Sequence, residues 1–342
     1  MCMWKILLNF ICISFALCSC NQQSEAYAPP VFSTIEEIHS YRLSDELIIG
    51  YPMDMFVNES YVFILALADN TWLQVYDKNT GEHIGGFVPK GQGPGEVVTG
   101  TTCSYDEEKH IISIFDETSM KLLTYHFNDD IKKSFTFIDE KAFYNCGASV
   151  RRVWPLKKDL FFIDGQLGTA SEQQKRFQLM LDTEVINEYN DFPVSSYTER
   201  LVFMSPTISI SPDRQKMAVG TLYGGILELF DLSGNIELRT LEKFYPPIIQ
   251  CLSGAIQNTE ETIWGFSTLC TTDDKIYSVL IGDKNPNLFN NISVFDWKGR
   301  PLIKYKTDCL VLKLCASPKE SGKLYGLAFS ENKEFYLVSL TV

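Results

Sequence analysis

A chain of 342 residues can bury a sizeable core, as one large all-β domain or as two domains. Its 45% apolar and 21% charged residues are ordinary for a globular protein, and its 13% aromatic residues favour β-strands. The formal net charge of −13 repels phosphate backbones, which argues against nucleic acid as a partner.

The N-terminal segment has the features of a bacterial lipoprotein signal peptide. Lys5 is the only charged residue among the first 24, and an apolar run follows it. Residues 6–19 make only 14 residues, whereas a membrane-spanning helix needs about 20. The run ends in Leu17-Cys18-Ser19-Cys20, which resembles the lipobox of bacterial lipoproteins. This resemblance implies cleavage before Cys20 and lipid attachment to its thiol.

Two other interpretations of this segment remain open: an ordinary cleaved signal in which Cys20 has no role, and a buried N-terminal helix. In the lipoprotein interpretation, residues 1–19 are the signal peptide, residues 20–30 are a lipidated N-terminus and polar tether, and residues 31–342 are the folded domain. Several acyl chains at one site give stable anchoring. We therefore expect a cell-envelope protein, anchored in the outer membrane and facing the periplasm, with surface exposure left open.

After the tether, one short pattern recurs six times: a polar or turn residue followed by apolar residues. Successive copies are 49, 49, 57, 59 and 48 residues apart, and six units fill residues 43–342. The positions we treat as equivalent are Val62, Ile111, Leu160, Met217, Ile276 and Leu324.

A second pattern follows the first in most units, and it predicts hairpins. Residues 73–77, 227–231 and 292–296 alternate apolar side chains, end in an aromatic residue and Asp, and precede a glycine-containing turn. Residues 121–129 are a weaker copy, and residues 174–190 are the poorest. Repeats of about 50 residues with about four antiparallel strands each predict a six-bladed β-propeller. Closing the ring requires a strand near residues 42–49 to complete the sheet that ends at Val342.

Residues 91–96 (GQGPGE) resemble the inter-blade loop of NHL-type propellers. Residues 292–302 (ISVFDWKGRPL) resemble a late-blade hairpin of a group with related blades, the TolB-like six-bladed propellers of bacterial lipoproteins, and residues 211–213 (SPD) before a strand are also typical of such blades. The resemblance covers about residues 43–342 and implies the fold, while it says little about activity. An insertion near residues 244–260 departs from the even repeat.

The glycine-rich loop at residues 91–96 also invites a phosphate-binding interpretation. No Gly-Lys-Ser/Thr follows it, no helical pattern follows it, and Glu96 repels phosphate. We therefore interpret it as a structural loop between blades, formed by Gly91, Gly93, Pro94 and Gly95.

Metal-binding and catalytic motifs are not evident in the sequence. Six cysteines besides Cys20 follow the signal peptide without C-x-x-C spacing, and the four histidines are isolated. Most of these cysteines are expected to be buried, with disulfide pairing open. We identify no catalytic residue and expect no cofactor. The histidines are His39, His83, His110 and His126.

Charged residues leave one alternative open, because a propeller channel can gather oxygen ligands for calcium. The candidate carboxylates, which we otherwise interpret as solvated turn residues, are Asp54, Asp106, Asp182, Asp273 and Asp274. A basic cluster at residues 151–152 and 157–158 is interpreted as a solvated face.

The predicted function is a binding or scaffold module for a protein or glycan partner, more in keeping with a non-enzyme than an enzyme. The alternative is a calcium-dependent hydrolase or lyase, similar to a lactonase, with its site in the central channel. Three inward carboxylates with an Asn or His at one channel mouth would distinguish it. The oligomeric state is open.

Overall fold

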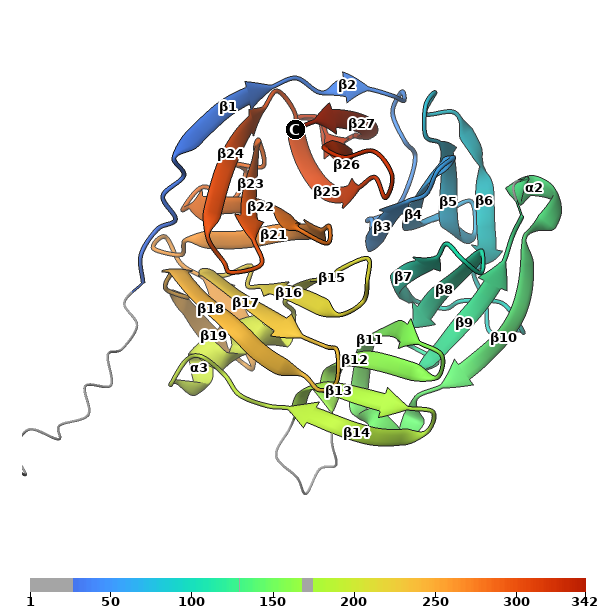
Figure 1. Cartoon of the computed structure of the whole chain (residues 1–342), viewed down its shortest axis with the longest axis horizontal. Coiled ribbons are helices and arrows are strands. Elements are labelled where there is room, and N and C mark those ends of the chain that lie inside the picture. Colours follow the sequence, from blue (N-terminus) through green and yellow to red (C-terminus); the bar gives the residue numbers. More distant parts are fainter. Residues whose placement is uncertain (1–26, 129, 168–174) are drawn as a thin grey trace, which may run out of the picture.

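Six antiparallel sheets lie around a central axis and form a closed six-bladed propeller (Figure 1). The structure is a computed structural model that describes residues 27–128, 130–167 and 175–342. The predicted signal peptide, Cys20 and the tether as far as Ala26 lie outside the described residues. The predicted fold is confirmed.

The first half of the ring contains three four-stranded blades, in which each chain segment runs from the central axis outward. Blade 1 consists of β3 (Asp54–Val57), β4 (Tyr61–Ala68), β5 (Thr71–Asp77) and β6 (His83–Pro89). Blade 2 consists of β7 (Gly100–Asp106), β8 (Ile111–Asp116), β9 (Lys121–His126) and β10 (Thr136–Ala142), with the short helix α2 (Ile131–Ser134) before β10. After a 3₁₀ turn, η1 (Tyr144–Cys146), blade 3 consists of β11 (Gly147–Lys157), β12 (Leu160–Leu167), β13 (Lys175–Leu181) and β14 (Glu184–Tyr189).

The second half begins with two short helical segments, α3 (Tyr197–Arg200) and η2 (Leu201–Met204). Blade 4 consists of β15 (Thr207–Ile210), β16 (Lys216–Gly220), β17 (Gly225–Asp231) and β18 (Glu237–Tyr245). The predicted insertion follows as a separate hairpin, β19 (Ile249–Leu252) and β20 (Ala255–Asn258). Blade 5 consists of β21 (Trp264–Thr271), β22 (Lys275–Asp283), β23 (Asn291–Asp296) and β24 (Pro301–Thr307), and blade 6 of β25 (Leu310–Ala316), β26 (Lys323–Phe329) and β27 (Phe335–Thr341).

The aspartate that ends the third strand of several blades shapes the following turn. Asp77 accepts hydrogen bonds from the backbone N–H groups of Asn79 and Thr80, both at 2.9 Å. Gly81 then takes a φ of +70°, where a side chain would be strained. Asp231 and Asp296 accept equivalent bonds from the residues after them. The Asp-to-Gly signal in the sequence is therefore a side-chain-capped hairpin turn.

All six repeat positions fall in the second strand of a blade. Val62, Met217, Ile276 and Leu324 are the second residue of their strands and are buried. Ile111 and Leu160 are the first residue and only half-buried, so the buried equivalents are one residue later, at Ile112 and Phe161. These two strands therefore begin one residue later in the repeat, directly after His110 and Asp159, which have positive φ.

The chain closes the ring with its own N-terminal part. The short strand β2 (Tyr41–Arg42) pairs antiparallel with β27, and Leu47 forms a further bridge with Phe335. The closing strand predicted near residues 42–49 is thus present. A second strand, β1 (Thr34–Ile38), was not predicted: it pairs parallel with β24 and gives blade 5 a fifth strand.

The core consists of apolar layers between neighbouring blades, since each sheet must bury both faces. An ion pair lies in one such layer, between blades 3 and 4. Arg176 is 4% exposed and Glu228 is 1% exposed, and Arg176 Nη1 donates to Glu228 Oε1 at 3.0 Å. The guanidinium also lies over the rings of Phe203 and Phe177, at 4.6 and 4.9 Å from their centroids.

Candidate functional site

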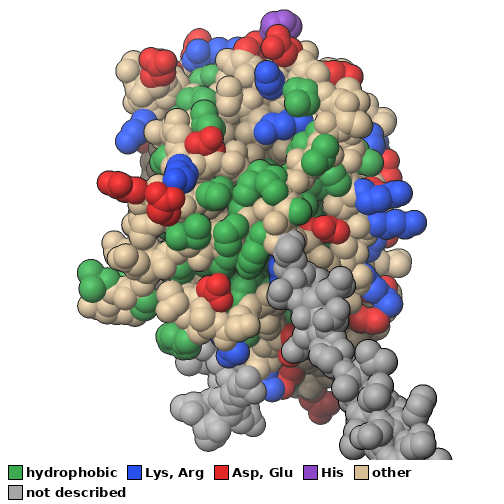
Figure 2. Space-filling view, turned by 90° about the vertical axis from the view of Figure 1, so that its left-hand side faces the viewer, with side chains coloured by type: hydrophobic (Ala, Val, Ile, Leu, Met, Phe, Trp, Pro, Cys, Tyr) green, Lys and Arg blue, Asp and Glu red, His purple; other side chains and the backbone are tan. Residues whose placement is uncertain are grey.

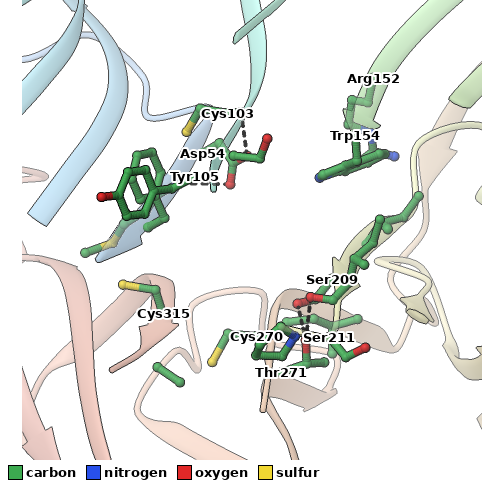
Figure 3. A pocket seen from close by; sticks show the side chains of 18 of the residues that line it. Asp54, Cys103, Tyr105, Arg152, Trp154, Ser209, Ser211, Cys270, Thr271 and Cys315 are labelled. Atoms are coloured by element: carbon green, nitrogen blue, oxygen red, sulfur yellow. Dashed lines mark hydrogen bonds between the residues drawn. The ribbon is translucent and has the colours of Figure 1, made fainter. Parts of the chain in front are cut away.

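A cavity of about 1080 Å³ lies along the propeller axis, and we refer to it as the central cavity. Its walls are residues of the innermost strands β3, β7, β11, β15, β21 and β25, one from each blade. In Figure 3, Asp54 and Cys103 lie on one side of the cavity, Arg152 and Trp154 on another, and Ser209, Ser211 and Thr271 on a third. Residues far apart in sequence therefore meet there, because each of the six blades contributes its innermost strand to the wall of one cavity.

One wall of the central cavity is rich in hydroxyl groups. Thr207, Ser209 and Ser211 alternate along and just after β15, which places them on one face of the strand. Ser209 Oγ is 3.0 Å from Thr271 Oγ1, which donates to the Ile210 carbonyl at 3.0 Å. These bonds join blades 4 and 5 and hold several hydroxyls at the cavity wall.

The facing wall carries a half-buried carboxylate and a half-buried amine, of Asp54 and Lys313. Asp54 Oδ1 accepts the N–H of Met55 at 2.8 Å, and Oδ2 accepts the N–H of Cys103, in the next blade, at 2.9 Å. Burial raises the pKa of Asp54, and the Cys103 N–H opposes this shift. Lys313 Nζ donates to the Met53 carbonyl at 2.8 Å, and burial lowers the pKa of Lys313.

A bulge in β11 places two consecutive arginines together. Val150 pairs with Gly165 and Arg152 pairs with Asp164, so Arg151 is an extra residue on its strand. Asp164, which is 1% exposed, accepts bonds from Arg152 Nε at 2.8 Å and Arg151 Nη2 at 3.3 Å. A Cβ on Gly165 would lie 2.2 Å from the Ser149 carbonyl oxygen, so this bulge needs glycine there.

The interpretation of residues 151–152 as a solvated face was wrong. Both arginines line the central cavity, and the Arg152 guanidinium lies 5.6 Å from the centroid of the Trp154 ring (Figure 3). The physical reason is that the buried Asp164 offsets the cost of drawing two cations inward. Lys157 also lines the cavity, whereas Lys158 is exposed outside its lining.

Glu117 lies beside this arginine pair and lines the same cavity. Burial raises its pKa, while the positive charges of Arg151 and Arg152 act in the opposite direction. The carboxylates of Asp164 and Asp116 raise it further. Glu117 is therefore a partly buried acid whose ionised form is disfavoured.

Three thiols line the central cavity: Cys103, Cys270 and Cys315. Burial raises the pKa of all three, so they stay protonated and are weak nucleophiles at neutral pH. Among the described residues, all six cysteines are free; five are buried and Cys251 is exposed.

The predicted candidate carboxylates are only partly brought together. Asp54, Asp106 and Asp273 line the central cavity, but Asp182 and Asp274 do not. Asp106 is paired with Lys109 at 2.9 Å, and Asp182 accepts a bond from Lys141 at 2.8 Å. Within the described ranges, no three of the His, Cys, Asp and Glu side chains are grouped so that they could hold a metal ion.

The glycine-rich loop joins β6 of blade 1 to β7 of blade 2. Gly95 has a φ of +73°, and a Cβ there would lie 2.9 Å from the Phe137 ring. Glu96 Oε2 accepts the N–H of Gly93 at 2.8 Å, so the carboxylate of the loop itself occupies this amide. The loop residues Gly91, Gly93, Pro94 and Gly95 are outside the lining of the central cavity.

Sequence reasoning missed Arg151, Arg152, Lys313 and Glu117 as cavity residues. Two signals were available. Lys313 interrupts an otherwise apolar strand (LVLKLCA), and Gly165 directly after Asp164 is a glycine inside a strand, which often marks a bulge.

A second, smaller hollow of about 350 Å³ lies on the outer side, next to the paired strands β1 and β24. Val31, Phe32, Ile35 and Tyr245 are among its lining residues. Figure 2 shows the side of the molecule at the left of Figure 1, where hydrophobic side chains gather among charged ones.

No helix in the described part of the chain is long and apolar enough to span a membrane.

Comparisons with known proteins agree with this architecture. The family model described as "TolB-like 6-blade propeller-like" matches residues 31–319. A protein assigned as exported from Bacteroides fragilis NCTC 9343 has a similar structure, with a TM-score of 0.59, 15% identity, and coverage of 90% of this chain and 98% of that one. A DUF4221 family member from Bacteroides vulgatus ATCC 8482 gives a TM-score of 0.52 and 11% identity, over 90% of this chain and 96% of that one. No curated protein matches the sequence.

Proposed function

The chain belongs to the TolB-like six-bladed propeller family, and from this premise we propose that it is a lipid-anchored binding module of the bacterial cell envelope. Its ligand is a glycan, bound in the central cavity. The observation that carries this proposal is the lining of that cavity. Hydroxyl groups, the Trp154 ring with the Arg152 guanidinium over it, and several charged side chains face the same space.

Sugars present many hydroxyl groups and apolar ring faces, and the central cavity offers partners for both. Ser209, Ser211 and Thr271 can both donate and accept hydrogen bonds. Trp154 supplies an aromatic surface on the neighbouring wall (Figure 3). The volume of about 1080 Å³ is at the upper end of the range of about 300–1,000 Å³ found for small-molecule sites, which suits an oligosaccharide.

The state of the acidic and thiol groups favours binding over hydrolysis. Asp54 holds two backbone N–H groups, Asp164 holds two arginines, and the cavity thiols have raised pKa values. A general base or nucleophile needs an accessible lone pair. Asp54 and Asp164 already use oxygen lone pairs in these bonds, and the thiols are held in their protonated form. No specific observation favours the calcium-dependent hydrolase, and it is kept as an outcome of the test.

Envelope placement is supported by the N-terminal sequence and by one relative. Residues 6–19 and Cys20 have the features of a lipoprotein signal, and the similar Bacteroides fragilis protein is assigned as exported. Without residues 1–19, the chain has 29 basic and 43 acidic side chains, a net charge of −14. Such a charge keeps a protein soluble beside a membrane rather than adsorbed on anionic lipid.

The test is calorimetric titration of the full chain, carrying Cys20→Ala, with a panel of neutral and acidic oligosaccharides. Trp154→Ala should weaken binding by about tenfold, the loss expected for one aromatic contact. Trp264→Ala is the matched control, because Trp264 is equally half-buried in an innermost strand but lies outside the cavity lining. Equal losses in both variants, or release of a cleaved product with calcium, would contradict the proposal.

A further inference from the structure

We infer that the glycan carries a carboxylate, and that Arg151, Arg152 and Lys313 hold this group inside the central cavity. We call these three residues the cation cluster. This inference rests on the proposed function, since it names the chemical class of the ligand of the same site.

The arginine pair has more positive charge than its protein partner neutralises. Arg151 and Arg152 share the single carboxylate of Asp164, which leaves one positive charge in excess. Each guanidinium has five N–H donors. Arg152 uses Nε and Nη2 on Asp164, and Arg151 uses Nη2. The bulge at Arg151 thus presents a double guanidinium fork to the cavity, a geometry suited to carboxylate recognition.

Lys313 adds a third cation from blade 6, on the opposite side of the ring from blade 3. Its ammonium donates to the Met53 carbonyl and is attracted by Asp54 and repelled by Arg152. Lys313 and Arg152 line the same cavity from opposite blades, so an anion placed between them would be attracted by both.

The acids of the cavity do not cancel this preference. Asp54 is committed to the N–H groups of Met55 and Cys103, and burial disfavours its ionised form. Glu117 has a raised pKa for the same reason. Asp106, another acid of the lining, is paired with Lys109. Asp164 offsets one of the three cations, so the cation cluster keeps an attraction for a ligand carboxylate beside two acids whose ionised forms burial disfavours.

An acidic peptide would bring the same anionic group, but the walls favour a sugar. The wall next to the cation cluster carries Ser209, Ser211 and Thr271, whose hydroxyl oxygens can each accept a further hydrogen bond from a sugar hydroxyl while their own protons are bonded within the protein.

The experiment uses the full chain with Cys20→Ala and three pairs of trisaccharides, made of galacturonic, glucuronic or mannuronic acid. Each pair is a free acid and its methyl ester, which differ only in charge. In at least one pair we expect the acid to bind at least tenfold more tightly than the ester. Arg152→Gln should remove this difference, because the acid loses a charged partner that the ester does not engage. Lys313→Met should reduce the difference, and it preserves the apolar stem in its strand.

Arg239→Gln is the matched control, because Arg239 is half-exposed on the outer strand β18 and also pairs with carboxylates. Thermal melting of every variant separates loss of binding from loss of folding. Equal affinity for acid and ester would overturn the carboxylate inference and leave the proposed glycan function standing. Binding of none of the six sugars, or tighter binding of triglutamate than of any sugar, would overturn both.

Discussion

Buried charges in this propeller are arranged in pairs whose partners come from different strands or blades. Arg176 and Glu228 join blades 3 and 4, and Arg151 and Arg152 meet Asp164 within blade 3. A buried ion pair adds little net stability, because desolvation opposes the attraction. Loss of one partner, however, leaves an uncompensated charge, and this asymmetry gives the first prediction.

Arg176→Met should destabilise the protein by about 3–5 kcal/mol, because Glu228, at 1% exposure, would be left buried without its partner. Urea unfolding measures the change. The double variant Arg176→Met with Glu228→Leu should recover most of the loss, since neither charge remains. A single variant as stable as the unmodified chain would contradict this account.

The raised pKa of Glu117 predicts the sign of a pH effect. An acid whose pKa is raised by folding binds its proton more tightly in the native state, so its penalty is absent below the unfolded pKa of about 4.3 and grows as pH rises through the folded pKa. The charged groups around it are Arg151 and Arg152 on β11, Asp164 on β12 and Asp116 on β8. Glu117→Gln should therefore raise the melting temperature at pH 7.

Melting curves at pH 4 and pH 7 check this prediction. The stabilisation by Glu117→Gln should shrink toward zero at the lower pH, where the native glutamate is itself neutral. Glu82→Gln, at an exposed hairpin position, serves as the comparison and should change little at either pH. A Glu117→Gln variant that melts lower than the unmodified chain at pH 7 would show that its attraction to the arginines outweighs burial.

At the scale of the element, the turns and loops decide where strands start and stop. Gly95 lies in the loop between blades 1 and 2 with a φ of +73° and the Phe137 ring against it. Gly95→Ala should lower the free energy of unfolding by about 1–3 kcal/mol, from backbone strain and the displaced ring. Urea denaturation measures the loss.

Gly93→Ala is the control in the same loop. Gly93 is not among the positive-φ glycines, and its nearest neighbours are the flexible carboxylate atoms of Glu96, at 3.1 Å from an added Cβ. This variant should cost clearly less than Gly95→Ala. Equal losses would mean that crowding, and not backbone conformation, limits the loop.

The strands were predictable where the information is local. Apolar alternation ending in Asp and a glycine turn predicted the hairpins around Asp77, Asp231 and Asp296, because each turn is capped by a side chain within the same few residues. Strand β1 was not predictable in this way. Its residues 34–38 are mostly exposed, and their pairing with β24 depends on a segment about 270 residues away in the chain.

The cavity was harder to predict than the blades for the same reason. Its cations come from β11 and β25, and their proximity follows only from the curvature of the whole ring. A pair of adjacent arginines ordinarily points to opposite faces of a strand, one of them toward solvent. The extra residue at Arg151 alters that alternation, and the sequence hints at it only through Gly165.

At the scale of the whole molecule, the predicted anchor at Cys20 can be tested directly. Cys20→Ala should release the protein from the membrane fraction into the aqueous phase of a detergent partition, because the thiol that would carry the lipid is missing. Ser24→Ala, in the adjacent tether, should stay in the detergent phase. Detergent partition of the Cys20 variant would contradict lipid anchoring at this residue.

The pairing of β2 with β27 also has a consequence for the order in which the protein acquires its structure. Tyr41 leaves the ribosome about 300 residues before Ser339, the residue it pairs with. Until β27 has emerged, β2 has no strand to pair with, so blade 6 is incomplete and the ring is open between the last blade and the first. Nascent chains therefore keep unpaired strand edges throughout their synthesis. Such edges can pair with other chains and aggregate, and chaperones can bind them. A chain that stops before β27 lacks the partner of β2, so the ring can close only after this last strand of the propeller has been made.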